Sequence, residues 1–311
     1  MKKILITEFM EQDSINLIAK KFDVTYDPML CENVKDLVSQ IHLFDAIIVR
    51  NKTQVNDSVL QKARNLKFVG RLGVGLDNID NDFCEKNNIF VQPATGMNAD
   101  SVAEYVINCS LSLLKNIPLM HQGTITGRWP RTSVESKELR GKTMGLLGFG
   151  IIGKKVSKLA QAFCSRIVAC DPFVPSSAES KYNISLAERQ ELFEIADIIS
   201  IHLPLNNETK DLLNFNSFSL MKKKPIIINS SRGSIVNEGD LIRAYQDNLI
   251  SGFALDVYES EPVKENFFKK IDNTMNCILT PHIAGVTNES NARVSQFIAE
   301  KLIRFFEKIT D

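Results

Sequence analysis

Three residues carry side chains that could bind a carboxylic acid and transfer a proton to or from it: Arg232, Glu261 and His282. Each follows an apolar, β-rich run, respectively PIIIN, GFALD and NCILT. A histidine titrates near neutral pH and can give and take a proton, and a glutamate beside it would fix its tautomer. The guanidinium of an arginine can hold a carboxylate through two parallel hydrogen bonds. Alone, each would be an ordinary loop residue, but three of them beyond successive strand ends favour a catalytic site.

A glycine-rich turn precedes these residues in the chain. Gly148, Gly150 and Gly153 form the pattern G-x-G-x-x-G between the expected strand TMGLLG and the expected helix IIGKKVSKLAQAF. The first glycine allows the tight bend, the second lets a pyrophosphate approach the backbone, and the third lets the helix pack close to the strand. The N–H groups and the positive end of the helix then favour a diphosphate. The pattern therefore predicts a dinucleotide site.

Two aspartates lie at the ends of expected strands further along the chain. Asp171 comes directly after the expected strand RIVAC, where a carboxylate can accept hydrogen bonds from both hydroxyls of a ribose and repel a 2′-phosphate. No arginine follows it directly in DPFVPSS, so we expect NAD rather than NADP. Asp256, which ends GFALD, would either orient the nicotinamide amide or cap a loop. The chemistry expected is hydride transfer to or from NAD, coupled to proton transfer at His282.

Two alternations of strands and helices must position these residues. The first has the expected strands ILIT, VTYD, AIIVR, LKFVGRL and IFVQ, and the second has TMGLLG, RIVAC, DIISIH, PIIIN, GFALD and NCILT. Helical patterns lie between most of them, one of them capped by Asn56, as expected for parallel sheets covered on both faces. The stretch SVAEYVINCSLSLL, which reads as a buried helix, and the polar interval 121–142 separate the two alternations. A last amphipathic helix, ESNARVSQFIAEKLIRFFEKI, follows the second sheet and is free to pack on the first domain.

The composition excludes several classes of protein. The 37 basic residues balance 37 acidic ones, which leaves no excess positive charge to attract nucleic acid or an anionic membrane. No apolar run approaches the roughly 18 residues of a membrane span, and the start MKKILITEF lacks the apolar core of a secretory signal. We therefore expect a cytoplasmic protein. The cysteines and histidines are scattered, so we expect buried free thiols and no metal site.

The motifs GRLGVGLDNID, NADSVAEY, GLLGFGIIG, NSSRGSIVNEGDL, GFALDVYESEP and TPHIAGVT occur in this order along the chain. Through these motifs the sequence resembles the D-isomer-specific 2-hydroxyacid dehydrogenases, and the resemblance extends over nearly its whole length. The resemblance implies an α/β fold of two doubly wound parallel-sheet domains. A Rossmann NAD-binding domain, residues 98–285, would be inserted into a flavodoxin-like substrate domain, residues 1–97 plus 286–311. It also implies a homodimer formed through the cofactor domain.

The resemblance assigns roles to individual residues. It implies that Arg232, Glu261 and His282 are the catalytic set and that the substrate's carboxylate meets the backbone of Val74 and Gly75, where neighbouring N–H groups can form an anion-binding nest. The positions that match the family's cofactor-binding pattern are Gly148, Gly150, Ile152, Gly153, Asp171, His202, Leu203, Pro204, Thr209, Ser231, Asp256 and Gly285. Trp129 matches the family's G-x-W segment, where we expect it to pack.

The identity of the substrate depends on fewer residues. Arg50 and Lys52, in VRNKTQVN, lie at another strand end and would suit a phosphate, although they could equally form a solvated surface pair. Since the resemblance is strongest to the 3-phosphoglycerate dehydrogenases of serine biosynthesis, we expect oxidation of D-3-phosphoglycerate. A hydroxypyruvate or glyoxylate reductase is the alternative, as is a dehydrogenase of another D-2-hydroxyacid such as lactate or sulfolactate.

One branch of the family has a different kind of function, that of a non-enzymatic, NAD(H)-sensing co-repressor. Such a protein would show an eroded catalytic set or a long tail, whereas this sequence has all three catalytic residues, so we expect an enzyme. A formate dehydrogenase would carry glutamine in place of Glu261. The chain ends soon after its last helix, so we expect neither the regulatory domain of the longer 3-phosphoglycerate dehydrogenases nor feedback by serine through it.

Overall fold

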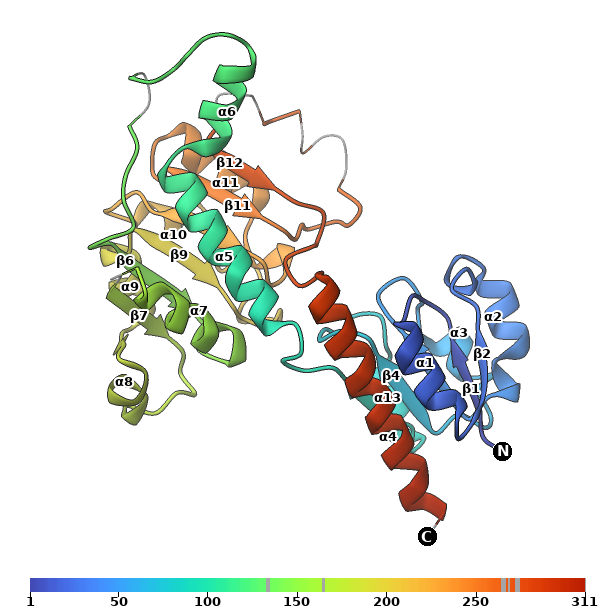
Figure 1. The fold of residues 1–311 in the computed structure, drawn as a ribbon. Helices are drawn as coiled ribbons and strands as arrows, with labels where there is room; N and C mark the ends of the chain where they lie inside the picture. The colour runs from blue at the N-terminus through green and yellow to red at the C-terminus, as the bar shows by residue number, and fades with distance from the viewer. Residues whose placement is uncertain (133–134, 164–165, 264–266, 268, 272–274, 311) are drawn as a thin grey trace. The chain divides into compact units, whose positions relative to one another are not determined.

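The structure is a computed structural model, which describes residues 1–132, 135–163, 166–263, 267, 269–271 and 275–310. The chain divides into two compact units (Figure 1). The first unit comprises residues 1–98 and 286–311, and the second comprises residues 99–285. This division lies one residue from the boundary expected from the sequence. None of the helices in the described part of the chain is both long enough and apolar enough to cross a membrane.

The described strands of the first unit form one parallel sheet in the order β2-β1-β3-β4-β5. They are β1 Lys3–Ile6, β2 Asp23–Tyr26, β3 Ala46–Val49, β4 Phe68–Arg71 and β5 Phe90–Pro93. All five match strands expected from the sequence. The central strand β3, with the residues AIIV, is buried throughout because helices cover both faces of the sheet. The flavodoxin-like order confirms the predicted fold of this unit.

The last helix of the chain returns to the first unit, as the sequence predicted. The helices of this unit are α1 Gln12–Ala19, α2 Val34–Gln40, α3 Asp57–Leu60, α4 Asn81–Lys86 and α13 Asn288–Thr310. α13 packs against α1 and β4 (Figure 1). Gly70 in β4 allows this approach, since a Cβ on it would lie 2.7 Å from the Cγ2 atom of Ile298 in α13. Asn56 precedes α3, but its side chain accepts from the Ser58 hydroxyl instead of capping a backbone N–H.

The described strands of the second unit form a parallel sheet in the order β12-β11-β10-β9-β6-β7-β8. They are β6 Thr143–Leu147, β7 Arg166–Cys170, β8 Ser185–Leu186, β9 Ile198–Ile201, β10 Ile226–Asn229, β11 Gly252–Leu255 and β12 Cys277–Leu279. The run from β8 through β7 and β6 to β9, β10 and β11 is the Rossmann order, and it confirms the predicted fold. Its direction reverses between β6 and β9, which is where such sheets bind ligands. The short strand β8 was not expected from the sequence.

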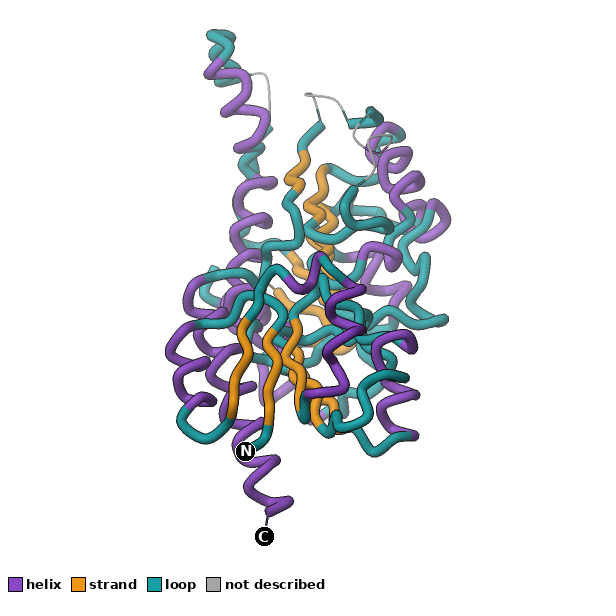
Figure 2. Tube along the Cα trace, turned by 90° about the vertical axis from the view of Figure 1, so that its right-hand side faces the viewer, coloured by secondary structure: helices purple, strands orange, loops and turns teal. Residues whose placement is uncertain are grey.

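Helices cover both faces of the second sheet (Figure 2). Those of one face, α5 Ala99–Leu114 and α7 Ile151–Gln161, share a core that contains Val106 and Val156. Those of the other face are α9 Arg189–Ile195, α10 Phe215–Ser219 and α11 Glu238–Gln246, with Phe193, Phe218 and Leu241 in their core. α8 Ser177–Tyr182 follows β7. The long buried helix expected after Asn98 is α5.

The polar interval contains a helix that the sequence did not indicate. α6 Ile117–Ile125 begins before this interval and extends into its first residues, with a proline in the first turn. Trp129, just beyond α6, has a positive φ of 49° and is 73 % exposed. The expectation that this indole packs is therefore wrong for the chain by itself, since most of the residue is exposed.

Candidate active site

The residues expected to be catalytic follow three adjacent strands of the second unit. β10, β11 and β12 are neighbours in the sheet, and Arg232, Glu261 and His282 come after their respective carboxyl ends. Parallel strands end at one edge, and that edge is where ligands bind in a doubly wound sheet. The topology therefore brings three residues, distant in the sequence, to one edge of one sheet.

Glu261 and His282 are joined directly. The Nδ1 atom of His282 lies 2.7 Å from the Oε2 atom of Glu261, and the other carboxylate oxygen accepts from the backbone N–H of Tyr258 at 3.1 Å. The side chains of His282 and Glu261 are 51 % and 38 % exposed, respectively. An ionised carboxylate can only accept, so Nδ1 carries the hydrogen of this bond. The pair therefore presents Nε2 as the nitrogen that exchanges a proton.

Arg232 lies on a loop that packs against the loop of Glu261. Its Nη1 atom donates to the carbonyl of Ser231 at 2.7 Å, and the side-chain amide of Asn229 donates to the backbone carbonyl of Arg232 at 2.9 Å. Next to it, a Cβ on Gly233 would lie 1.8 Å from the carbonyl carbon of Tyr258. Only glycine allows the two loops to touch at this point. The loop of Arg232 is thereby fixed against the loop that carries Glu261.

Both carboxylate oxygens of Asp256 accept hydrogen bonds from the turn that contains His282. Asp256 is 1 % exposed. Its Oδ1 atom accepts from the hydroxyl of Thr280 at 2.6 Å and from the N–H of Ile283 at 2.7 Å, and its Oδ2 atom accepts from the N–H of Ala284 at 2.7 Å. Of the two roles that the sequence left open, this geometry is that of a loop cap.

The glycine turn has the geometry that its pattern predicts. Gly148 has a φ of +93°, which side chains rarely adopt. A Cβ on Gly153 would lie 2.5 Å from the carbonyl oxygen of Gly148, whereas a Cβ on Gly150 would meet nothing within 4 Å. The space beside Gly150, at the start of α7, is therefore open in the protein itself. The N-cap residue of α7 is Gly150 itself, which has no side chain to cap this end of the helix.

Asp171 is tied to the same turn. Its Oδ2 atom accepts from the N–H of Phe149 at 2.8 Å, and its Oδ1 atom accepts from the N–H of Phe173 at 3.0 Å. Each carboxylate oxygen has a second lone pair, so the residue retains the capacity to accept from ribose hydroxyls. The open space at Gly150, the helix end and this carboxylate fit a dinucleotide, with the diphosphate at α7 and a ribose at Asp171.

The remaining cofactor positions surround the turn or lie along the same edge. His202 and Leu203 border Gly148, whose added Cβ would lie 2.5 Å from the His202 carbonyl oxygen. Burial lowers the pKa of His202 to about 4, so the ring is neutral, and its Nε2 atom lies 3.0 Å from the Ser200 hydroxyl. The hydroxyl of Thr209 donates to the Pro204 carbonyl at 2.6 Å. The other three positions are Ile152 in the first turn of α7, Ser231 bonded to the Asn229 side chain, and Gly285 at the end of the unit.

In the first unit, Arg50 and Lys52 have separate partners. Arg50 donates from Nη2 to the Asn291 side chain at 2.9 Å, and burial lowers the pKa of its guanidinium. The Nζ atom of Lys52 lies 3.2 Å from Glu32 in an exposed ion pair. The backbone of this loop surrounds Glu8, whose carboxylate accepts from all four N–H groups of residues 50–53 at 2.7–3.2 Å. Arg50 is thus held in place by Glu8 and Asn291, whereas Lys52 is a surface residue.

Val74 and Gly75 follow β4 in the first unit. Within the described residues, their N–H groups donate to no backbone carbonyl. The guanidinium of Arg71 covers the neighbouring Gly73, since a Cβ there would lie 1.3 Å from its Nη1 atom. The loop therefore combines backbone donors with a cation, as an anion site requires.

Sequence reasoning missed two residues of these sites. Arg71 stands inside the quoted motif GRLGVGLDNID, and Glu8 follows the first strand in ILITEF. Both lie at the carboxyl edge of the first sheet, so the rule that singled out Arg50, a polar residue just past a strand end, would have found them.

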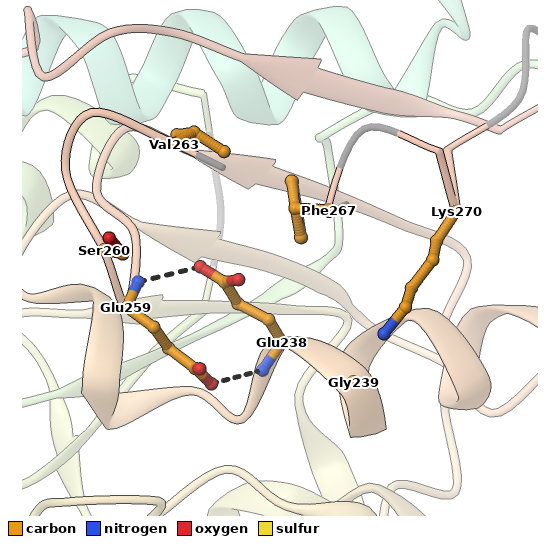
Figure 3. A pocket seen from close by; sticks show the side chains of 7 residues that line it. All are labelled: Glu238, Gly239, Glu259, Ser260, Val263, Phe267 and Lys270. Carbon is orange, nitrogen blue, oxygen red and sulfur yellow. Dashed lines mark hydrogen bonds between the residues drawn. The ribbon is translucent and has the colours of Figure 1, made fainter. Parts of the chain in front are cut away.

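A pair of reciprocal hydrogen bonds near Glu261 borders a cavity (Figure 3). The N–H of Glu238 donates to the Glu259 carboxylate at 3.1 Å, and the N–H of Glu259 donates to the Glu238 carboxylate at 2.8 Å. This exchange fastens the loop before Glu261 to the start of α11, and burial raises the pKa of Glu238. The cavity has a volume of about 240 Å³ and is lined by Glu238, Gly239, Glu259, Ser260, Val263, Phe267 and Lys270, none of them an expected site residue.

Candidate metal ligands do not cluster in the described residues. No group of three or more histidine, cysteine, aspartate or glutamate side chains there could hold a metal ion. The described cysteines are Cys31, Cys84, Cys109, Cys170 and Cys277, and Cys164 lies outside the described residues. Three of these five thiols are only partly buried, so the expectation of buried cysteines holds in full for Cys84 and Cys109 alone.

Comparison with known proteins gives a consistent family. The family described as "D-isomer specific 2-hydroxyacid dehydrogenase, NAD binding domain" matches residues 107–284. The chain is 38 % identical to the (S)-sulfolactate dehydrogenase of Chromohalobacter salexigens over 305 residues, 98 % of each chain. It is 34 % identical to the D-3-phosphoglycerate dehydrogenase of Bacillus subtilis over 305 residues, which are 98 % of this chain but 57 % of that protein.

The fold agrees with a solved structure of the family. The D-lactate dehydrogenase of Aquifex aeolicus, complexed with NAD and lactic acid, superimposes with a TM-score of 0.86 at 25 % identity, covering 99 % of this chain and 96 % of that one. The chain therefore belongs to the D-isomer-specific 2-hydroxyacid dehydrogenases, the NAD-dependent oxidoreductases whose fold and motifs it carries.

Proposed function

We propose that Arg232, Glu261 and His282 are the catalytic set for reversible hydride transfer at C2 of a D-2-hydroxyacid. The observation that carries this proposal is the 2.7 Å contact between His282 Nδ1 and Glu261 Oε2, which presents Nε2 for proton transfer. Bound NADH supplies the hydride in the reductive direction. His282 then gives its Nε2 proton to the carbonyl oxygen of the 2-oxoacid, and it takes that proton back in the oxidative direction. Glu261 holds the imidazole in place, and Arg232 holds the carboxylate and polarises the carbonyl.

The cofactor site proposed lies on the second unit. The diphosphate binds at Gly148, Gly150, Ile152 and Gly153, where the open space at Gly150 and the uncapped end of α7 support it. Asp171 accepts from the adenosine ribose and disfavours a 2′-phosphate. The residues proposed to line the rest of the site are His202, Leu203, Pro204, Thr209, Ser231 and Gly285. Asp256 acts there through the loop that it caps.

The substrate proposed is a three-carbon 2-hydroxyacid with a second anionic group at C3. Arg50 supports this, because its partly buried guanidinium is held by the Asn291 side chain and has further N–H donors for a second anion. Val74 and Gly75 offer N–H groups to the carboxylate. D-3-phosphoglycerate and sulfolactate both have this chemistry, and similar proteins named for each exist. Lys52 is not part of the proposed site because Glu32 already neutralises it.

Steady-state oxidation of NADH, followed by absorbance, tests both parts of the proposal. The substrates are phosphohydroxypyruvate, sulfopyruvate, hydroxypyruvate, glyoxylate and pyruvate. We expect one of the first two to give the highest kcat/KM. A preference for hydroxypyruvate or glyoxylate would contradict the C3 anion but not the catalytic set. Tight NADH binding without turnover on any of them would contradict the enzyme and favour the NAD(H)-sensing interpretation.

Arg50→Gln, with Lys52→Gln as its matched control on the same loop, tests the C3 anion separately. We expect Arg50→Gln to lower kcat/KM for the charged substrate by about 10-fold or more, as loss of a charge-assisted contact does, and to leave hydroxypyruvate much less affected. Lys52→Gln should leave both values within about twofold, as is typical when an exposed ion pair is removed. Equal losses on both substrates would contradict a specificity role for Arg50.

We also propose that the second unit forms a homodimer through α6. The side chains of Ile117, Ile125 and Trp129 are 51 %, 63 % and 73 % exposed, and burial of such apolar surface against a second copy would be favourable. Light scattering after gel filtration should give twice the chain mass, and Ile125→Glu should give the monomer. Leu220→Glu, at an exposed apolar residue beyond α10, is the control that should stay dimeric. A monomeric wild type would contradict the proposal.

A further inference from the structure

His282 occupies a backbone conformation that its surroundings must impose. Its φ is +57°, in the left-handed region that side chains other than glycine rarely adopt. The residues on either side of it are held by Asp256: Thr280 through its hydroxyl, and Ile283 and Ala284 through their N–H groups, all at 2.6–2.7 Å. The turn that presents the imidazole is thus wrapped around one buried carboxylate. A strained conformation persists where the surrounding structure holds it in this way.

The direction of the hydrogen bonds around Thr280 can be deduced from its single hydroxyl proton. Thr280 gives that proton to Asp256, because an ionised carboxylate can only accept. Its Oγ1 atom also lies 2.7 Å from the hydroxyl oxygen of Tyr105, so Tyr105 is the donor in that contact. Burial raises the pKa of Tyr105, which keeps its hydroxyl protonated and able to donate. The result is a chain of donors from Tyr105 through Thr280 to Asp256.

Thr280 is held on its backbone as well. Its carbonyl accepts from the N–H of His282 at 3.1 Å and lies 3.1 Å from the hydroxyl of Tyr258, whose single proton is shared with the Leu255 carbonyl at 3.2 Å. Tyr258 belongs to the loop that carries Glu261, and its own N–H donates to the Glu261 carboxylate. Thr280 is therefore the residue at which the supports of both catalytic side chains meet.

We propose that Thr280 and Tyr105 are positioning residues, which set the turn that aims His282 by completing the hydrogen bonds around Asp256. The inference rests on the proposed role of His282 as the acid and base of the reaction. It assigns a function to α5, since Tyr105 lies in that helix and supports the site through a hydroxyl. Neither residue need touch substrate or cofactor for this function.

Kinetics of three variants test the proposal: Thr280→Val, Thr280→Ser and Tyr105→Phe. With NADH and the best 2-oxoacid of the panel, Thr280→Val should lower kcat by about 10- to 100-fold, because a misplaced catalytic group loses rate while binding persists. The KM for the 2-oxoacid and the dissociation constant of NADH should stay within about twofold. Thr280→Ser keeps the hydroxyl and should restore kcat to within about threefold of the wild type, and Tyr105→Phe should fall between.

Tyr245→Phe is the matched control. It removes another hydroxyl from the same unit, one that accepts from the N–H of Asn276 and lies outside the proposed site. If Tyr245→Phe is less stable than the wild type but keeps its kcat, a loss of kcat in Thr280→Val reports mispositioning of His282 and not general destabilisation. An unchanged kcat in Thr280→Val, or a Thr280→Ser variant as slow as Thr280→Val, would overturn the proposal.

A second measurement does not need turnover. In spectra of protein labelled with ¹³C at the histidine Cε1, the chain gives signals from four histidines, and His282→Gln identifies the one from His282. Thr280→Val should move or broaden that signal and leave those of His42, His121 and His202 unchanged. An unmoved His282 signal would overturn the proposal even if the wild type turned over none of the 2-oxoacids. That absence of turnover would by itself contradict only the proposed function.

Discussion

The two nitrogens of His282 have different tasks in this account. Nδ1 is held by Glu261 at 2.7 Å, while Nε2 is left to exchange the proton. Glu261 is itself oriented by the N–H of Tyr258, so the imidazole is fixed through two successive hydrogen bonds. Arg232 has a different role from His282 and Glu261, because its planar guanidinium presents several N–H donors in fixed directions. The geometry of these three side chains should therefore matter for catalysis as much as their charge.

Arg232→Lys tests this point. Lysine keeps the positive charge but presents it as a single point, which cannot hold a carboxylate in two parallel hydrogen bonds and polarise a carbonyl beside it. We expect kcat/KM for the best 2-oxoacid to fall by about 100-fold or more, a loss typical of removing a transition-state contact. Arg243→Lys, in α11 over the ring of Phe215, is the control that should leave kcat/KM unchanged. Near-normal turnover by Arg232→Lys would contradict the assignment.

At the scale of elements, the junction of β6 and α7 has two glycines with separate purposes. Gly153 has to be small for the fold, because its Cβ would collide with the Gly148 carbonyl oxygen at 2.5 Å. Gly150 has open space around it and a φ of −75°, so the folded chain does not require a glycine there. A glycine that the fold does not need, at the open end of a helix, is what close approach of a diphosphate explains.

Gly150→Ala and Gly153→Ala should therefore fail in different ways. Gly150→Ala should keep the melting temperature of the wild type and raise the dissociation constant of NADH by about 10-fold or more, because the methyl group occupies the space of the diphosphate. Gly153→Ala should lower the melting temperature by several degrees, as overpacking does. Gly239→Ala, in α11 with ordinary space for a Cβ, is the control for both measurements. Unchanged NADH binding by Gly150→Ala would remove the diphosphate from this turn.

The loop after β3 depends on one buried carboxylate. Glu8 is 5 % exposed and accepts from four N–H groups of residues 50–53. Glu8→Gln replaces one acceptor oxygen with an NH₂ group that faces donors, so we expect the free energy of unfolding to fall by about 1–3 kcal/mol. Glu11→Gln, at the start of α1 where the side chain caps nothing, should change it by less than about 0.5 kcal/mol. Urea unfolding measures both, and equal values would contradict the role given to Glu8.

At the scale of the whole molecule, much of the architecture follows from the pattern of apolar runs. All eleven strands expected from the sequence are present. Most of them are continuous apolar runs that stand out against polar loops, as buried parallel strands are. β8 was missed since two residues, Ser185 and Leu186, make no such run. α6 was missed because its residues, IPLMHQGTI, are not segregated into an apolar and a polar face.

The candidate site was predictable only in part. Strand ends pointed to Arg232, Glu261 and His282, because topology alone brings such residues to one edge. The supports of the site were not predictable. Asp256 accepts hydrogen bonds from the turn of His282, and Glu8 accepts them from the loop of Arg50. These contacts depend on where side chains meet in space, and no spacing along the chain encodes them.

Stability of the molecule should depend on pH through His202. Burial lowers its pKa in the folded state to about 4, below the value of about 6.5 expected in an unfolded chain. Above pH 6.5 the ring is neutral in both states. As the pH falls from 6.5 to 4, the unfolded chain binds a proton that the folded chain does not, so the free energy of unfolding should decrease by about 1–3 kcal/mol.

His202→Asn should remove that part of the decrease, and urea unfolding at several pH values measures it. His121→Asn, at an exposed histidine, is the control that should keep the wild-type dependence on pH. Parallel curves for the wild type and His202→Asn between pH 6.5 and 4 would show that His202 is not the cause.

The most direct test of the catalytic claim is the single-turnover rate of NADH oxidation by His282→Asn. With the best 2-oxoacid of the panel, we predict a rate about 10²- to 10⁴-fold below that of the wild type, the range that loss of a general acid gives. NADH should bind to the variant as tightly as to the wild type, since the imidazole is assigned to proton transfer alone. A rate within about threefold of the wild type would contradict the account.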